Sequence, residues 1–191
     1  MSTAALPAPV PAMPLMTAEE FLAQYGDESG VELIKGRVVR DPMPGGKHGE
    51  VCMAAGFIIR EFVKQHGLGR VMSNDTLIRT TDAPASFRGA DVCFISYSRL
   101  PKDKETPSGP VPSPDLVVEV RSPTDRINKL TAKAAEYLEA GVAVVVVLIP
   151  ETQSAAIFRP DSLPVQLAAD AELTLPDLLP GFSVPVRKFF E

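Results

Sequence analysis

One run of ten residues, GVAVVVVLIP at 141–150, constrains the fold more than any other stretch of the sequence. The run is apolar throughout, but it is far shorter than the roughly 20 residues that a membrane-spanning helix needs. Its valines favour a β-strand, and a strand without polar positions is normally covered on both faces. The sequence therefore predicts a central strand that lies between two layers of other elements.

Helical and extended patterns alternate on the N-terminal side of this strand. A short helix is expected to begin after Thr17, which has Glu20 at capping-box spacing, and a long helix is expected over about 48–65 with Gly67 as its end. Further predicted elements are a β-hairpin at 31–41 that turns at Lys35-Gly36, strands at 70–80, 90–96 and 115–121, and a helix that starts at Ser122-Pro123-Thr124-Asp125 and runs to Gly141. This order, without an internal repeat, predicts an α/β (α+β) fold with a mixed central sheet flanked by helices.

The bulk properties of the chain indicate a single soluble domain. Residues 1–15 are rich in Ala and Pro and carry no charge, so we expect a disordered tail followed by one domain over 16–191. With 45 % apolar residues the chain can build a real core. The sequence starts without a basic region followed by an apolar stretch, and Cys52 and Cys93 lack metal-ligand spacing. We therefore expect a cytoplasmic protein with ordinary thiols and no membrane association.

The formal net charge of −5 argues against indiscriminate binding to polyanions. The charge is nevertheless uneven, because residues 121–133 contain Arg121, Arg126, Lys129 and Lys133 against a single acid. Such a stretch could contact a phosphate backbone, or it could be an ordinary solvated helix face.

The stretch PDLVVEVRSP at 114–123 places charges on an otherwise apolar strand. Because side chains alternate along a strand, Asp115, Glu119 and Arg121 share one face and the intervening apolar residues share the other. Glu119 lies between two valines, where an ionised carboxylate costs several kcal/mol unless it is paired or binds a cation. The charges therefore form either an internal ion pair or a functional site, whereas Asp115 alone is typical of a strand start.

Asp91 begins a second apolar strand, DVCFI, and would meet Glu119 if the two strands are neighbours. Two converging carboxylates, with water and phosphate completing an octahedron, suit Mg²⁺ or Mn²⁺ rather than Zn²⁺. Phosphodiester chemistry also needs a cation near the attacked phosphate. Arg121 and Lys133 are the two candidates, and Arg121 has the alternative of simply pairing with Glu119 or Asp115.

The order and spacing of these motifs resemble the Uma-type restriction endonuclease family of bacteria, within the PD-(D/E)XK nuclease superfamily. The segments that carry the resemblance are VELIKGRVV, PMPGGKHG, ADV at 90–92, PDLVVEVRSPTDR at 114–126 and LPGF, together with Lys133, Tyr137 and Gly141. They cover nearly the whole chain after the Ala/Pro-rich start. The resemblance implies a restriction-endonuclease-like core and a metal-dependent endonuclease that cleaves DNA.

The resemblance also implies roles for the single residues that stand at the family's motif positions. Asp91 and Glu119 match the two acids of the motif, so it implies that they bind Mg²⁺ (or Mn²⁺). Arg121 occupies the lysine position of the (D/E)XK element, but in this family the lysine lies on the next helix. Lys133 is therefore the expected catalytic cation, and Arg121 and Asp115 are possible supporting residues.

Other positions match less closely. Glu32 matches the early ELI-x-G element and would add a further acid to the site, and His48 begins the long helix in a family-like context as a possible supporting residue. Ala90 stands where the family usually has Pro. The central strand has Val146 and Ile149 where many relatives have Trp and an Asp-Pro ending. These departures affect structural positions and leave the expected site intact.

The sequence thus predicts a magnesium-dependent endonuclease that contacts the DNA backbone and acts as a homodimer, since cutting both strands needs two sites. Two alternatives remain open. One is a nuclease-like domain that binds nucleic acid or a protein partner without cutting. The other is an α/β protein in which Asp115, Glu119 and Arg121 form a buried polar cluster.

Overall fold

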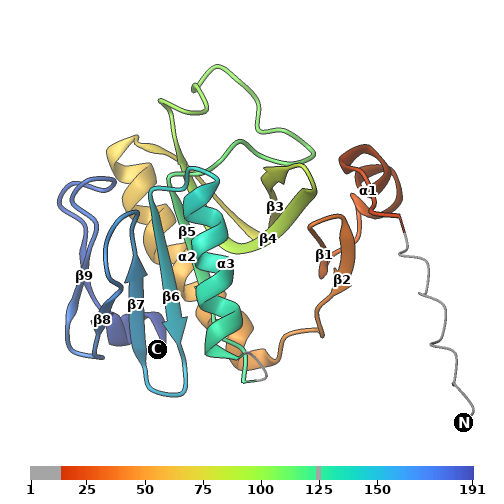
Figure 1. Cartoon of the computed structure of the whole chain (residues 1–191). Coiled ribbons are helices and arrows are strands. Elements are labelled where there is room, and N and C mark those ends of the chain that lie inside the picture. Colours follow the sequence, from red (N-terminus) through yellow and green to blue (C-terminus); the bar gives the residue numbers. More distant parts are fainter. Residues whose placement is uncertain (1–13, 124–125) are drawn as a thin grey trace, which may run out of the picture.

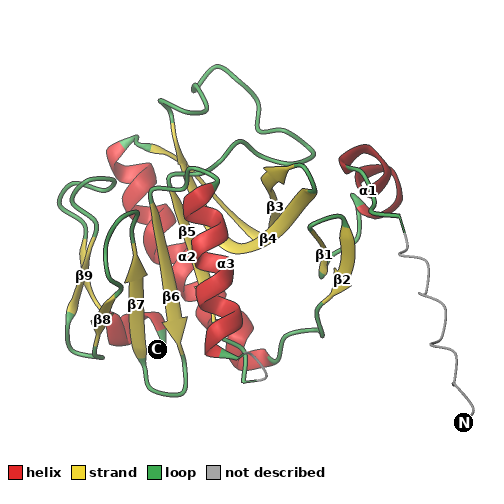
Figure 2. Cartoon of the chain, in the orientation of Figure 1, coloured by secondary structure: helices red, strands yellow, loops and turns green. Residues whose placement is uncertain are grey.

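The computed structural model describes residues 14–123 and 126–191 (Figure 1). Most of the tail predicted at 1–15, and Thr124 and Asp125 of the predicted helix start, lie outside the described residues. Within the described part, a large sheet is flanked by helices, and a hairpin with a short helix lies at one end of it (Figures 1 and 2).

An eight-stranded mixed sheet forms the centre of the protein. Its strands are β1 (Val31–Ile34), β2 (Arg37–Arg40), β3 (Gly69–Asp82), β4 (Ala85–Ser96), β5 (Leu116–Val120), β6 (Val144–Ile149), β7 (Ser154–Phe158) and β8 (Val165–Leu167). They follow the order β2-β1-β4-β5-β6-β7-β8, with β3 beside β4, and only β5 and β6 pair in parallel. A two-stranded ladder of β9 (Glu172–Thr174) and β10 (Ser183–Pro185) and the 3-10 helix η1 (Val186–Phe189) complete the C-terminal part.

The central strand β6 is covered on both faces, as predicted. Val146 and Leu148 pack in a cluster with residues of helix α2 (Gly46–His66), and Val145 and Val147 pack with residues of helix α3 (Ile127–Glu139). Figure 2 shows these two helices beside the strands of the sheet. The predicted mixed sheet flanked by helices is confirmed.

The N-terminal unit follows its local sequence signals. Thr17 and Glu20 form the predicted capping box at the start of helix α1 (Ala18–Tyr25), with each side chain accepting the other residue's backbone N–H. β1 and β2 form the predicted hairpin around Lys35-Gly36, whose positive φ angles of 49° and 73° fit a tight two-residue turn. Phe21 stacks on Phe87 at 5.5 Å between ring centroids, which joins α1 to β4.

Two elements begin about five residues away from the predicted position. α3 begins at Ile127 rather than at Ser122, because the N–H of Arg121 still bonds the carbonyl of Leu148 in the sheet at 2.8 Å. β4 begins at Ala85 rather than at about residue 90, because its pairing with β3 extends to the turn between them. None of the described helices has both the length and the apolarity to cross a membrane.

One edge of β4 changes partner along its length, and this change positions the site. Along this edge, Phe87 pairs with Leu33 of β1, and further on Val92 pairs with Val118 of β5, while β3 covers the other edge throughout. Residues 88–91 lie between these two pairings. We call this interval the β4 gap, and side chains from several elements converge on it.

Candidate active site

Glu119 lies near the end of β5 and has only 5 % of its surface exposed. Its carboxylate is held from α3, because Lys133 Nζ donates to Oε2 at 2.8 Å and the Tyr137 hydroxyl donates to Oε1 at 3.0 Å. Burial raises the pKa of Glu119 to about 8; Lys133 opposes the shift and the charge of Asp91 adds to it. The buried side chain of Glu119 therefore has the cationic partner that a buried acid requires.

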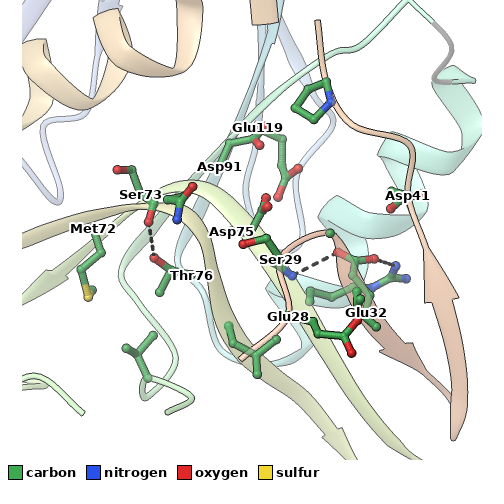
Figure 3. Close-up of a pocket in the computed structure, with 18 of the residues that line it drawn as sticks. Glu28, Ser29, Glu32, Asp41, Met72, Ser73, Asp75, Thr76, Asp91 and Glu119 are labelled. Atoms are coloured by element: carbon green, nitrogen blue, oxygen red, sulfur yellow. Dashed lines mark hydrogen bonds and ion pairs between the residues drawn. The ribbon is translucent and has the colours of Figure 1, made fainter. Parts of the chain in front are cut away.

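Asp91 lies on β4 beside Glu119, and the expected pairing of their strands is present. The pairing of β4 with β5 ends at Val92 and Val118, and beyond it Asp91 Oδ2 accepts the N–H of Val120 at 2.7 Å. A side-chain oxygen thus satisfies a main-chain donor where the two strands part. Figure 3 shows Asp91 and Glu119 close together at this fork.

Lys133 links Glu119 to a second buried acid. Its Nζ donates to the carbonyl of Gly89 at 2.9 Å and lies 3.3 Å from Oε1 of Glu32. Burial would lower the pKa of Lys133, but the charges of Glu119 and Glu32 outweigh it and raise the pKa well above its usual value. Glu32 also accepts from the N–H of Gly89 at 3.1 Å and from Arg88 at 2.8 Å. Lys133 is therefore a charged group fixed inside the β4 gap.

The two candidate cations have different surroundings. Lys133 contacts Glu119, whereas Arg121 extends to Glu151 in the turn after β6, with 3.8 Å between NH1 and Oε2. Ser122 lines the cavity of the site, and Arg121 does not. The geometry favours Lys133 as the cation that acts beside Glu119.

Asp115 lies at the opposite end of β5. Its Oδ2 accepts the N–H of Ser96 at 2.7 Å, and its Oδ1 lies 2.9 Å from Nε of Arg99. These contacts anchor the start of β5 to the end of β4, which is the structural role of an aspartate at a strand start. Asp115 and Glu119 thus have separate partners, which argues against the alternative of one buried polar cluster.

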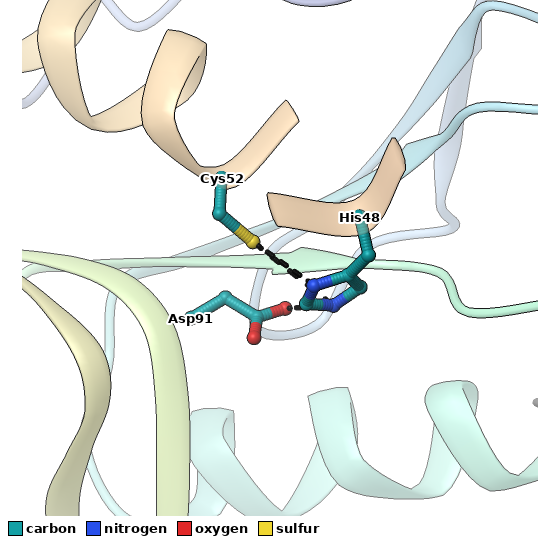
Figure 4. A group of neighbouring side chains, drawn as sticks. All are labelled: His48, Cys52 and Asp91. Atoms are coloured by element: carbon teal, nitrogen blue, oxygen red, sulfur yellow. Dashed lines mark hydrogen bonds and ion pairs between the residues drawn. The ribbon is translucent and has the colours of Figure 1, made fainter. Parts of the chain in front are cut away.

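His48 lies in the first turn of α2 and reaches the site from the face opposite α3. Its Nε2 is 3.3 Å from Oδ2 of Asp91, and its Nδ1 is 3.4 Å from Sγ of Cys52 (Figure 4). The hydrogen bond with Asp91 raises the pKa of His48, although burial opposes the shift. The histidine that the resemblance indicated is therefore a direct neighbour of Asp91.

Asp75 is a site residue that the motifs did not indicate. The β3–β4 register shifts between Ser73 and Thr76, and Asn74 and Asp75 in this bulge have positive φ angles of 69° and 54°. Gly89 lies against the bulge, since a Cβ there would be 3.1 Å from Cβ of Asp75. The sequence signal was the adjacent Asn and Asp in SNDT, because these two residues tolerate the left-handed region better than others.

Asp75, Asp91 and Glu119 line one cavity of about 480 Å³, and Figure 3 shows the carboxylate of Asp75 directed toward the other two. Burial raises the pKa of both Asp75 and Glu119, and the charge of Asp91 raises each further. A divalent cation held by Asp91 and Glu119 would relieve this repulsion, and an oxygen-only donor pair suits Mg²⁺ or Mn²⁺. The carboxylate oxygens of the three acids do not all lie within 4.8 Å of one another, so Asp75 would reach such an ion through a water molecule. The residues therefore fit the metal that the resemblance implied.

The chain is similar to known proteins in sequence and in fold. A family model described as "Uma2: Putative restriction endonuclease" matches residues 18–187. The crystal structure of "a putative nuclease belonging to DUF820" from Anabaena variabilis is similar with a TM-score of 0.78 and 23 % identity, over 92 % of this chain and 97 % of that chain. At this identity the likeness concerns the fold, and it confirms the predicted restriction-endonuclease-like core. No curated protein matches the chain.

Proposed function

Because the chain belongs to the Uma2 family, described as "Putative restriction endonuclease", we propose that it is a metal-dependent endonuclease that hydrolyses phosphodiester bonds of DNA. One observation carries the proposal: the buried carboxylate of Glu119 is held by Lys133 and lies beside Asp91 in an open cavity. A purely structural ion pair needs neither a second acid at its side nor a cavity, whereas phosphodiester hydrolysis needs both.

Asp91 and Glu119 would hold the Mg²⁺ or Mn²⁺ ion. When bound, such an ion polarises a phosphate oxygen and lowers the pKa of a water molecule. Asp91 is pre-positioned for this role because its Oδ2 is fixed by the N–H of Val120. Glu119 is fixed by Lys133 and Tyr137, and each of its oxygens retains a lone pair for a cation.

Lys133 supplies the positive charge beside the acids. Two of its ammonium protons bond Glu119 and Gly89 at 2.8 and 2.9 Å, and the contact with Glu32 is longer at 3.3 Å. A water molecule or a phosphate oxygen can replace this longest contact. Lys133 then orients the attacking water or offsets charge on the phosphate as the bond breaks. Glu32 keeps Lys133 in place and can hold a water molecule at the edge of the site.

DNA is the proposed partner, contacted mainly through its backbone, and a homodimer would bring two sites to the two strands. The basic residues between positions 121 and 133 contribute less to binding of the DNA backbone than their number indicates, because most of them are paired with acids. Lys129 pairs with Asp41 at 2.8 Å, Arg121 with Glu151, and Lys133 with Glu119. Magnesium would therefore provide much of the positive charge that meets the phosphate.

A second candidate function is a nuclease fold that binds nucleic acid or a protein partner without cutting. The acidic lining of the cavity, where exposed Asp27, Glu28 and Asp41 accompany the buried acids, favours the protein partner of this candidate over nucleic acid. Such a rim repels a phosphate backbone in the absence of a metal ion.

Plasmid cleavage tests these functions. The protein is incubated with supercoiled plasmid and Mg²⁺ or Mn²⁺, beside Asp91→Ala, Glu119→Ala and a control, Glu139→Ala, which removes an exposed acid from the end of α3. We expect nicked or linear DNA only with metal, and only from the wild type and the control. Cleavage that persists in both site variants would show that the site is elsewhere. Metal-dependent binding of the plasmid without any cleavage would favour the second candidate.

A further inference from the structure

A second group of metal-ligating side chains adjoins Asp91 on the side of α2 (Figure 4). His48 and Cys52 are four residues apart on this helix, so their side chains lie on the same face. Sγ of Cys52 is 3.4 Å from Nδ1 and 4.0 Å from Nε2 of His48, and Nε2 is 3.3 Å from Oδ2 of Asp91. A thiol, an imidazole and a carboxylate thus meet at one point.

The separations are close to those of ligands around a single tetrahedral ion. Zinc bonds of about 2.3 Å to sulfur and about 2.0 Å to nitrogen or oxygen place the donor atoms about 3.3–3.6 Å from one another. The donor atoms of His48, Cys52 and Asp91 all lie within 4.8 Å of one another, and all three residues are partly buried. Small side-chain rotations therefore suffice to bring the three donors onto one ion, with a fourth position left for water.

We propose that His48, Cys52 and Asp91 form a site for a thiophilic divalent ion such as Zn²⁺, and that an ion bound there inhibits hydrolysis because it occupies Asp91. Sulfur and imidazole ligands select Zn²⁺ over Mg²⁺, whereas Asp75 and Glu119 offer oxygen alone. Asp91 belongs to both donor sets, so the two ions compete for it. Binding replaces the thiol proton of Cys52, and this proton is released to solvent. The binding is independent of the proposed function, and only the inhibition rests on it.

The surroundings of Cys52 attract a cation. Asp91, Glu119 and Asp75 all place negative charge near its sulfur. Cys93, the other cysteine, lies on β4 and is completely buried in the cluster that packs against α3. It is the control for thiol chemistry outside the proposed site. Cys52 therefore has a histidine and a carboxylate beside its sulfur, and Cys93 serves as a thiol outside this group.

Cobalt titration tests the binding, since a thiolate on Co²⁺ gives a near-ultraviolet charge-transfer band. We expect this band to saturate at one Co²⁺ per chain in the wild type and in Cys93→Ala, to be absent in Cys52→Ser, and to disappear when Zn²⁺ is added. Absence of the band in the wild type, or its persistence in Cys52→Ser, would overturn the proposal. As a check independent of variant folding, one equivalent of Zn²⁺ should protect Cys52 of the wild type from alkylation, and unchanged alkylation would also overturn it.

The inhibition is measured with plasmid and saturating Mg²⁺, each protein being compared with its own zinc-free rate. The Zn²⁺ concentration that halves the rate should rise at least roughly tenfold in Cys52→Ser. Loss of a residue that only hydrogen-bonds a metal ligand already weakens metal affinity by about this factor, and loss of a ligand itself should weaken it at least as much. Equal sensitivity of the two proteins would refute the inhibitory role. A protein that shows the cobalt band but never cuts plasmid would refute the proposed function and retain the metal site.

Discussion

The Nζ atom of Lys133 lies 2.8 Å from Oε2 of Glu119, although the two residues belong to different layers of the fold. α3 is the crossover between the parallel strands β5 and β6, so its inner face covers the end of β5 where Glu119 lies. The same ammonium group reaches Glu32 of the N-terminal hairpin. One lysine of α3 thus joins β5 and β1 around the β4 gap.

Replacement of Lys133 by methionine should abolish most of the activity. The variant removes the charge beside the phosphate but keeps the packing of the side chain, and loss of one such electrostatic group typically costs about 100- to 1,000-fold in rate. Initial rates of plasmid cleavage at saturating Mg²⁺ measure the effect. Arg121→Met is the control, since Arg121 contacts Glu151 and should keep its rate within about tenfold of the wild type. A large loss of rate in Arg121→Met with little loss in Lys133→Met would instead make Arg121 the catalytic cation.

Replacement of Arg88 by methionine should destabilise the fold. Arg88 is 7 % exposed; its NH1 bonds Glu32 at 2.8 Å and its Nε bonds Glu136 at 3.0 Å. Its removal leaves Glu136 without its cation and leaves Glu32 with only the longer contact to Lys133. Loss of one partner from a buried pair costs about 3–5 kcal/mol. Urea unfolding of Arg88→Met should show a loss of this size. Arg79→Met, which breaks the exposed pair with Asp82, should cost about 1 kcal/mol or less. Similar losses in both variants would contradict the buried network.

The stability of the metal-free protein should fall as pH rises, and Glu119 should cause part of this fall. Its pKa is about 8 in the folded protein against 4.5 for an ordinary glutamate, so between these values the folded state binds more protons than the unfolded state. The free energy of unfolding therefore decreases with pH across this window. Relative to the wild type, Glu119→Gln should gain on the order of a few kcal/mol between pH 5 and pH 8.5. Urea unfolding in the presence of a chelator measures this, and parallel pH profiles of the two proteins would refute the shifted pKa.

Asp75→Asn should weaken the response to magnesium. Asparagine tolerates the positive φ of this position, so the variant changes the charge and keeps the backbone. We expect the Mg²⁺ concentration for half-maximal cleavage to rise roughly tenfold, with a smaller change in the maximal rate. Asp82→Asn, an exposed acid at the end of the same strand, is the matched control. A change in the maximal rate alone would assign Asp75 a role other than metal binding.

Local patterns in the sequence were sufficient to predict much of the fold. Valines around Glu119 showed that its carboxylate would be buried, and the Thr17–Glu20 spacing and the Lys35-Gly36 turn identified the N-terminal helix and hairpin. These features depend on neighbours in the chain. The approach of Asp91 to Glu119 required only the assumption that two strands are adjacent.

Features that depend on long-range register could not be read from the sequence. Asp75 enters the site through a bulge whose position is set by pairing with β4 and by the space at Gly89. Arg121 was a candidate partner for Glu119 or Asp115, but β5 ends at Val120 and the guanidinium of Arg121 lies 3.8 Å from Glu151, in a turn whose position the local sequence does not determine. Cys52 appeared to lack ligand spacing because its partners are His48 on the same helix and Asp91 on a distant strand rather than the second cysteine.

Manganese binding in the absence of DNA tests most directly whether Asp91 and Glu119 hold the metal ion. Free Mn²⁺ is followed by electron paramagnetic resonance while the protein is titrated. The wild type and Glu139→Gln should bind the ion with equal affinity, whereas Asp91→Asn and Glu119→Gln should each bind at least roughly tenfold more weakly. Unchanged affinity in both site variants would contradict a metal centre at the fork of β4 and β5.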